Sequence, residues 1–103
     1  MSTPFDIRYL QTAEADLEAI FDYILVDSPP AAVSMLEKFD HAISRLAVNP
    51  EIGADPKDDR LRKPGYRVLV VGDYLVFYVV KSRKRTVQIR RIVHGARRHS
   101  LRL

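Results

Sequence analysis

The apolar residues of this chain change their spacing between its first and second halves. In the first half they recur at i, i+3, i+4 and i+7, as on one face of an α-helix. In the second half they crowd into short segments rich in β-branched and aromatic residues. This order predicts a helical hairpin followed by a β-sheet, with both helical stripes in the core. The stripes are Leu17, Ile20, Phe21 and Ile24, then Ala32, Met35, Leu36, Phe39, Ile43 and Leu46.

Capping residues mark the ends of the two predicted helices. Thr12 is expected to cap the first helix, with Glu14 and Asp16 placing negative charge in its first turn, where the helix dipole favours it. Ser28 is expected to cap the second helix, because Pro29 follows at the first helical position. The two helices are therefore predicted to be joined directly.

Three β-strands are predicted in the second half of the chain. Tyr66 to Val71 and Tyr74 to Val80 are joined by Gly72-Asp73, a two-residue hairpin signal. The second of these segments is apolar on both faces, which predicts a central strand. Thr86 to His94 forms the third strand and ends at Gly95. Val87, Ile89 and Val93 are expected to share one face of it.

The N-terminal segment completes the predicted sheet. Phe5 to Leu10 alternates apolar and polar residues, with Phe5, Ile7 and Tyr9 on one side. Residues 48–64 lack periodicity and predict a loop, with a short extended piece around Arg60 to Lys63. The predicted class is α+β, an antiparallel β-sheet of about four strands with an N-terminal α-helical hairpin packed on one face, in the order β-α-α-β-β-β.

Size and composition set the expected organisation and environment. A chain of 103 residues with 47% apolar content suits a single domain over residues 1–103. It has no cysteine, so neither a disulfide framework nor a thiolate metal site supports the fold. The N-terminus lacks a signal-peptide pattern, and no apolar run is long enough to span a bilayer. We expect a soluble, cytoplasmic protein without a membrane partner.

The charge is divided unequally along the chain. Residues 1–59 carry four Lys and Arg against twelve Asp and Glu, a net charge of −8, whereas residues 60–103 carry thirteen against one, a net charge of +12. A concentration of like charge usually faces a polyanion or an acidic partner. The alternative is that the basic half pairs with the acidic helices of the same molecule.

Four short stretches, in order, resemble the RelE/ParE superfamily of type II toxins. They are ADLEAIFDYI (residues 15–24), NPEIG (residues 49–53), GYRVLVVGDYLVFY (residues 65–78) and IRRIVHGAR (residues 89–97). The resemblance also covers the length and the order of elements. It implies a toxin that inhibits bacterial growth, has no cofactor or small-molecule substrate, and is neutralised by a cognate antitoxin that wraps it.

The superfamily divides by target, and two positions favour its ParE branch. RNA-cleaving RelE-type members have an arginine at the position of Leu75. They also tend to have a catalytic tyrosine or histidine near the end, where this chain has only His99. Arg97 does match a superfamily arginine. The ParE-type target is DNA gyrase, bound without catalysis. The alternatives are a ribosome-dependent mRNA endoribonuclease, with the ribosome and mRNA as partners, or an inactive member that only binds its antitoxin.

Candidate site residues follow from the chemistry that each function needs. Cleavage through a 2′-OH needs proton-transfer groups and cations, for which the candidates are Arg67, His94, Arg97 and His99. The alternative for His94 is a hydrogen bond that caps the strand end near Gly95. Binding of a target or antitoxin would use exposed tyrosines and arginines, although tyrosines on a sheet often only pack. The binding candidates are Tyr66, Arg67, Tyr74, Tyr78, Arg97 and Arg98.

The remaining sequence patterns indicate either a structural role or no functional role. Arg90 and Arg91 are adjacent in a strand and should diverge, so the one nearer the helices needs an acidic partner such as Glu14 or Asp16. His94 and His99 lack the spacing and carboxylate neighbours of a metal site, and none is expected. A generic nucleic-acid-binding module is the remaining non-toxin hypothesis, but the sequence has no recognition-helix or RNP pattern.

Overall fold

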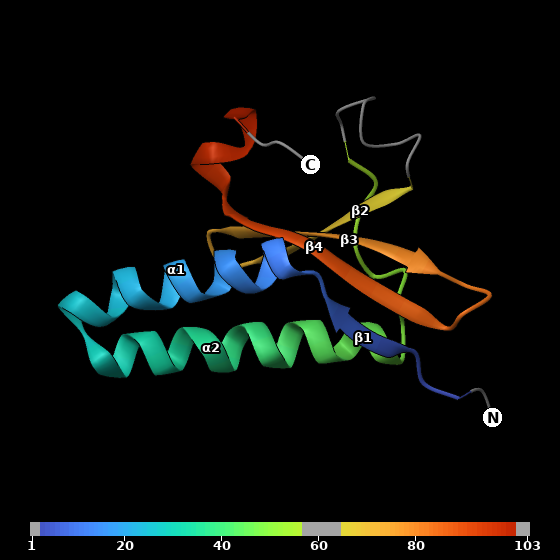
Figure 1. Ribbon diagram of the computed structural model, residues 1–103, viewed down its shortest axis with the longest axis horizontal. Coiled ribbons are helices and arrows are strands. Elements are labelled where there is room, and N and C mark those ends of the chain that lie inside the picture. Colours follow the sequence, from blue (N-terminus) through green and yellow to red (C-terminus); the bar gives the residue numbers. More distant parts are fainter. Residues whose placement is uncertain (1–2, 57–64, 101–103) are drawn as a thin grey trace.

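The helices and strands follow the order predicted from the sequence (Figure 1). The computed structural model describes residues 3–56 and 65–100, with the side chains of residues 98–100 excepted. The extended piece expected at residues 60–63 therefore lies outside the described residues. The described elements are β1 (Asp6–Tyr9), α1 (Gln11–Asp27), α2 (Pro29–Ser44), the 3-10 helix η1 (Arg45–Ala47), β2 (Tyr66–Val71), β3 (Tyr74–Lys81), β4 (Thr86–His94) and the 3-10 helix η2 (Gly95–Ser100).

The helical hairpin turns at the predicted cap. Ser28 adopts an extended conformation, its hydroxyl accepts the N–H of Ala31 at 3.3 Å, and Pro29 opens α2. The prediction for Thr12 was wrong, because Leu10 is the N-cap of α1 and Thr12 already lies inside the helix. Leu10 still belongs to the sheet, since its N–H donates to the carbonyl of Ile89 at 2.9 Å. Strand pairing therefore sets where α1 begins.

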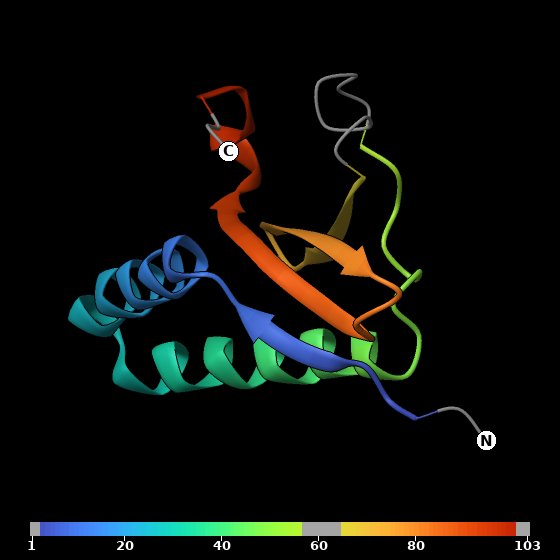
Figure 2. The ribbon, with the colours of Figure 1, turned by 45° about the vertical axis from the view of Figure 1, so that its right-hand side comes forward.

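The sheet is mixed rather than wholly antiparallel. Its strands lie in the order β1-β4-β3-β2, and the β2–β3 and β3–β4 pairs are antiparallel as predicted. The β1–β4 pair is parallel, which corrects the prediction at this edge. The cause is the hairpin itself: α1 leads away from β1, and α2 returns the chain to the start of β1, where the N–H of Phe5 donates to the carbonyl of Ala47. β2 then runs in the same direction as β1, and so does β4 (Figure 2).

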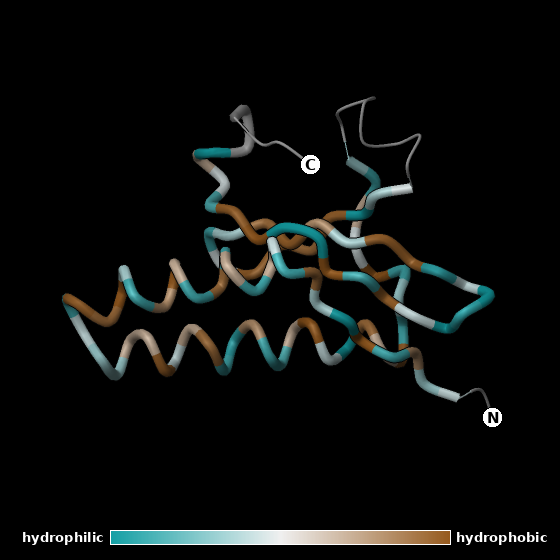
Figure 3. The backbone as a smooth tube through the Cα atoms, in the orientation of Figure 1, coloured by the Kyte–Doolittle hydropathy of each residue, from teal (hydrophilic) through white to brown (hydrophobic). Residues whose placement is uncertain are grey.

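The main core lies between the helical hairpin and one face of the sheet. Both helices alternate polar and apolar residues, while apolar residues run along the middle of the sheet (Figure 3). Phe5, Ile7 and Tyr9 pack against this core from β1, as predicted. Its buried residues are Ala13, Phe39, Ile43, Leu46, Val71, Val76, Tyr78, Val87, Ile89 and Ile92.

A β-bulge in β4 moves one predicted core residue to the opposite face. Phe77 pairs with Arg91 and Tyr78 with Ile89, so Arg90 is an extra residue in β4. An extra residue reverses the alternation of the strand beyond it. Ile92 therefore joins the main core, and the expectation that Val93 shares a face with Ile89 was wrong. Val93 packs in a second cluster on the other face of the sheet, the far-face cluster of Tyr66, Val68, Leu75, Phe77, Val79 and Val93.

Candidate functional site

Side chains of α1 continue the edge of the sheet where β1 ends. β1 pairs with β4 only as far as Ile89. One turn further along, the hydroxyl of Thr12 donates to the carbonyl of Arg90 at 2.9 Å. Asp16, four residues on and on the same side of the helix, accepts the N–H of Ile92 at 2.9 Å. Backbone groups at the edge of a sheet need partners, and here two helical side chains supply them.

Asp16 also forms an ion pair with Arg91. Arg91 Nε donates to Asp16 Oδ2 at 2.7 Å and a terminal nitrogen of its guanidinium donates to Oδ1 at 3.1 Å, a two-point contact between half-buried side chains. The hydrogen bond to Asp16 raises the pKa of Arg91, and burial opposes this increase. The prediction that one arginine of the Arg90-Arg91 pair needs an acidic partner on the first helix is confirmed.

Two open grooves flank α1. One has a volume of about 410 Å³, and the other, of about 520 Å³, is bordered by β4 and η2. We call this larger space the α1–β4 groove. It contains three residues that the sequence proposed for a site, Tyr74, His94 and Arg97, together with the Asp16–Arg91 pair. Its lining is Asp16, Ala19, Ile20, Tyr23, Tyr74, Arg91, Ile92, Val93, His94 and Arg97.

Aromatic side chains form one wall of this groove. The rings of Tyr74 and His94 meet edge to face with centroids 5.3 Å apart, and Tyr74 meets Phe39 of the core in the same way at 5.5 Å. Burial raises the pKa of Tyr74, followed by the charge of Asp73 and then by Tyr23. Tyr23 itself is 77% exposed at the mouth of the groove. This wall therefore offers apolar ring surface beside the two arginines.

His94 anchors the start of η2. Its Nδ1 accepts the backbone N–H of Ala96 at 3.1 Å, which agrees with the expected cap near Gly95 and requires Nδ1 to be unprotonated. The N–H of Gly95 donates to the carbonyl of Asp73 at 2.8 Å, so η2 is also tied to the β2–β3 turn. These contacts hold exposed Arg97 at the groove. The side chains of Arg98 and His99 lie outside the described residues.

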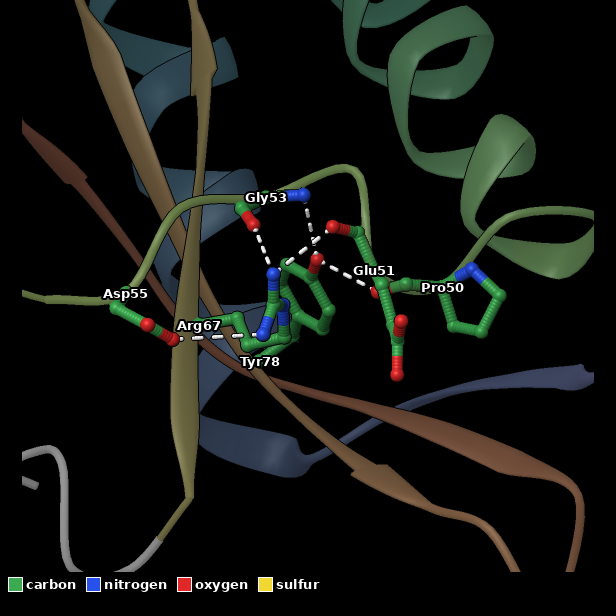
Figure 4. A network of polar contacts seen from close by, with 6 residues as sticks. All are labelled: Pro50, Glu51, Gly53, Asp55, Arg67 and Tyr78. Atoms are coloured by element: carbon green, nitrogen blue, oxygen red, sulfur yellow. Dashed lines mark hydrogen bonds and ion pairs between the residues drawn. The ribbon is translucent and has the colours of Figure 1, made fainter.

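Arg67 and Tyr78 lie elsewhere and hold a loop (Figure 4). The Tyr78 hydroxyl donates to the carbonyl of Pro50 at 2.7 Å and accepts the N–H of Gly53 at 2.9 Å. Arg67 donates to the carbonyls of Glu51 at 2.9 Å and Gly53 at 2.5 Å. Tyr78 has no exposed surface, so the interpretation of Tyr78 as a binding residue is corrected: it closes the core beneath the loop.

Gly53 shows how closely this loop approaches the sheet. A Cβ atom added there would lie 2.8 Å from the carbonyl oxygen of Val68 and from a ring carbon of Tyr78. The loop also pairs directly with β2, through reciprocal backbone hydrogen bonds of 2.8 and 2.9 Å between Ala54 and Val68. The contacts of Arg67, which include Asp55 Oδ1 at 3.4 Å, are thus contacts within the fold.

Tyr66 does not line the α1–β4 groove. It is 7% exposed and packs in the far-face cluster with Phe77 and Val79. The guanidinium carbon of Arg90 lies 5.6 Å from the centre of its ring, while another nitrogen of Arg90 donates to Gln88 Oε1 at 2.8 Å. The far face therefore combines mainly apolar side chains with Tyr66 and Arg90.

The sequence thus proposed three residues of this groove for a site, Tyr74, His94 and Arg97, and did not propose Tyr23. Asp16, Ile20 and Tyr23 follow at i, i+4 and i+7 on α1, which is the signal that would have put Tyr23 beside the Asp16–Arg91 pair. Chemically, the groove combines cations with aromatic and apolar surface. Among residues 3–56 and 65–100, no group of three His, Asp or Glu side chains is arranged to hold a metal ion. No helix in those ranges is long and apolar enough to cross a membrane.

The fold is similar to that of toxin–antitoxin proteins of known structure. A structure described as the chromosomal ParDE system from P. aeruginosa matches with a TM-score of 0.72 and 24% identity, over 90% of this chain and 98% of that one. The RelBE2 toxin–antitoxin complex from Mycobacterium tuberculosis matches with a TM-score of 0.61 and 23% identity, over 88% and 98%. At these identities the matches establish the fold.

Sequence comparison establishes the family. The family model described as the ParE toxin of the type II toxin–antitoxin system, parDE, matches residues 7–99. Toxin ParE1 of Mycobacterium tuberculosis is 39% identical over 93 residues, which cover 84% of this chain and 88% of the relative. The residues matched by the family model include the hairpin, the α1–β4 groove and all of the sheet except Asp6, and on this basis the chain belongs to the ParE toxins of type II toxin–antitoxin systems.

Proposed function

We propose that this toxin arrests bacterial growth by binding and poisoning DNA gyrase, and that a cognate antitoxin neutralises it. Membership of the ParE family carries the proposal, because the superfamily resemblance assigns gyrase to this branch. The ParE1 relative and the structural match to a ParDE system support the same branch. On this proposal the toxin works by binding and performs no catalysis of its own.

The position of Leu75 supports binding rather than RNA cleavage. RNA-cleaving members of the superfamily resemble this chain but have an arginine here. Leu75 packs with Phe77 and Val93 in the far-face cluster, which supplies no cation for a phosphate. Cleavage of RNA needs cations where negative charge develops, as well as proton-transfer groups. A leucine within an apolar cluster provides neither.

We further propose that the α1–β4 groove contacts the target. Arg97 is exposed there, and Tyr23 presents most of its ring to solvent. Aromatic and arginine side chains contribute most of the affinity in protein interfaces, especially around an apolar floor such as Ile20 and Ile92. The groove therefore suits a protein surface that carries an acidic residue beside an apolar one.

A supercoiling assay with purified gyrase tests this proposal. Wild-type toxin should inhibit supercoiling and stabilise cleaved DNA. Arg97→Ala should weaken inhibition about tenfold, in the range expected for an interface arginine. Arg83→Ala is the matched control, because it removes an exposed cation from the β3–β4 turn, about 25 Å away along β4 by strand rise.

Mapping of RNA ends in arrested cells separates the alternatives. Cuts at ribosomal A sites, with no effect on purified gyrase, would show that the toxin is an mRNA endoribonuclease, for which His94 and Arg97 would be the first residues to test. Normal growth with abundant folded toxin and no antitoxin would leave only the inactive, antitoxin-binding member.

A further inference from the structure

A short segment between β3 and β4 carries the densest run of cations in the sequence. It consists of Lys81, the last residue of β3, and the turn that follows as far as Arg85, and four of its five residues are lysine or arginine. We call this segment the basic turn. It lies at the opposite end of β4 from η2 (Figures 1 and 2). By strand rise, the two ends of β4 are about 25 Å apart, so the basic turn is remote from Arg97.

Several other arginines of the basic half are held by contacts within the fold. Arg67 donates to carbonyls of the loop beside β2, and Arg91 is paired with Asp16. The guanidinium of Arg90 lies over the ring of Tyr66. These arginines are therefore already engaged, and they offer little to a partner.

The side chains of Lys81, Arg83 and Lys84 are not engaged in this way. All three residues are exposed, and within the described ranges none of their side chains forms an ion pair or a hydrogen bond. Asp6, on the neighbouring strand β1, has a partner of its own, because its carboxylate lies 3.8 Å from Arg8. The tip of the β3–β4 hairpin therefore keeps three positive charges for a partner outside the chain.

Arg85 fixes the shape of the basic turn. Its N–H donates to the carbonyl of Ser82 at 3.2 Å, and its own carbonyl accepts the N–H of Asp6 at 2.8 Å. Its guanidinium carbon lies 4.4 Å from the centre of the Phe5 ring, and the guanidinium also donates to the carbonyl of Thr3. A turn tied down through both backbone and side chain presents its cations in one arrangement, which lowers the entropy lost on binding.

The surroundings of the basic turn favour a phosphate backbone over a protein surface. Protein interfaces draw most of their affinity from aromatic and apolar anchors. Among the residues whose burial is described, no large exposed apolar side chain lies in the turn or in the strand residues next to it. Proteins that bind single strands stack bases on aromatic rings, and the nearby ring of Phe5 is covered by Arg85. The remaining attraction is that between cations and phosphates, which does not depend on base sequence.

We propose that Lys81, Arg83 and Lys84 bind the phosphate backbone of duplex DNA without sequence preference. Each cation neutralises a phosphate and releases counterions from the DNA, and this release supplies the affinity. The surface is separate from the α1–β4 groove, so the toxin can hold DNA with the basic turn and a protein with the groove. The inference does not depend on which target the toxin inhibits, and either can fail while the other stands.

Fluorescence anisotropy of a labelled DNA duplex of about 20 base pairs, titrated with full-length toxin at several salt concentrations, tests the inference. Affinity should fall steeply as salt is raised. The basic turn should contribute about −3 to the slope of log affinity against log salt concentration, since each phosphate contact contributes about −0.9. Duplexes of unrelated sequence should bind equally well.

A pair of toxin variants locates the binding. Arg83→Gln combined with Lys84→Gln should weaken binding at least about tenfold at low salt and make the salt slope shallower by about 2. Lys38→Gln with Arg45→Gln makes the same change of net charge at exposed residues outside the turn and should leave DNA binding unchanged. All four side chains are exposed, so both variants should keep the urea midpoint of wild type, which shows that they are folded.

Three results would overturn the inference. The first is an equal loss of affinity in both double variants, which would indicate attraction by net charge alone. The second is a salt slope that the basic-turn variant does not change. The third is tighter binding of a single strand, a duplex RNA or polyglutamate than of duplex DNA, which would assign the turn to a different polyanion. Gyrase inhibition is measured on the same proteins, and the basic-turn variant should inhibit as wild type does, so that failure of the proposed function is recorded separately.

Discussion

Asp16 on α1 holds Arg91 on β4 at two points, and the same carboxylate accepts the backbone N–H of Ile92. One side chain thus fixes the distance between the helix and the edge of the sheet. It also forms part of the α1–β4 groove, so Arg91 is held in a defined position there while its charge is balanced. The ion pair therefore connects the stability of the fold to the shape of the proposed target site.

Replacing Asp16 should therefore lower stability. Asp16→Ala removes both hydrogen bonds to Arg91 and the acceptor for Ile92, and we expect a loss of about 2–3 kcal/mol in the free energy of unfolding, since hydrogen bonds to charged groups are stronger than neutral ones. Urea denaturation measures it as a lower midpoint with an unchanged slope. Asp22→Ala, at an exposed position of α1, should change stability by less than about 0.5 kcal/mol. Equal effects of the two variants would contradict the assigned role.

The Tyr78 hydroxyl should be needed for the loop that contains Gly53. Tyr78→Phe keeps the buried ring but leaves the N–H of Gly53 and the carbonyl of Pro50 without this partner. An unmade hydrogen bond to a buried group costs about 1–3 kcal/mol, which thermal denaturation would detect. Tyr23→Phe, at a ring that is 77% exposed, provides the control and should be neutral. An unchanged melting temperature for Tyr78→Phe would mean that water replaces the hydroxyl.

Stability should fall at alkaline pH, in part because of Tyr9. Burial raises the pKa of Tyr9 above its ordinary value of 10.0, and Asp40 raises it further. Below pH 10 the phenol is neutral in the folded and unfolded states, so its contribution is complete. As the pH rises from 10 toward the raised pKa, the unfolded state ionises first and stability is lost. Tyr9→Phe should flatten this decline, measured by urea denaturation at several pH values. A decline as steep as that of wild type would exclude Tyr9 as a cause.

Charge reversal of the two arginines of η2, the basic segment that follows β4, should slow capture by the antitoxin and reduce toxicity together. Arg97→Glu with Arg98→Glu changes residues beyond the strands of the core, so folding should be retained. Stopped-flow mixing with purified cognate antitoxin should show association about tenfold slower at low salt, and a smaller difference at high salt. Arg83→Glu with Lys84→Glu in the β3–β4 turn makes the same charge change as a control. If association at low salt is unaffected, Arg97 and Arg98 contact the target and not the antitoxin.

The sequence predicted most of the fold because its local signals agree with one another. The apolar stripes, the Ser28-Pro29 cap and the Gly72-Asp73 turn each determine an element through contacts among near neighbours. The need of a strand arginine for a helix carboxylate also predicted the Asp16–Arg91 contact, because a charge near the core requires a partner. These are properties of residue type and spacing.

What the sequence did not predict depends on contacts between distant residues. The bulge at Arg90 has no signature of its own, yet it moves Val93 to the far face. Thr12 has the composition of an N-cap, but the pairing of Leu10 with Ile89 decides where α1 starts. The sequence pattern suggests that Tyr78 is exposed on the surface of the sheet, but the loop around Gly53 covers it. In each case a tertiary contact overrides a local preference.

The pairing of β1 with β4 has a consequence for the synthesis of this protein. The ribosome synthesises β1 well before β4, yet Asp6 pairs with Thr86 and Tyr9 with Ile89. The first strand therefore has no place in the sheet until most of the chain has been translated, and long-range pairing of this kind is slow to form. The β4 wall of the α1–β4 groove is likewise made well after α1. A partly synthesised chain that stops before β4 therefore lacks both the partner of β1 and one wall of the groove proposed for the target.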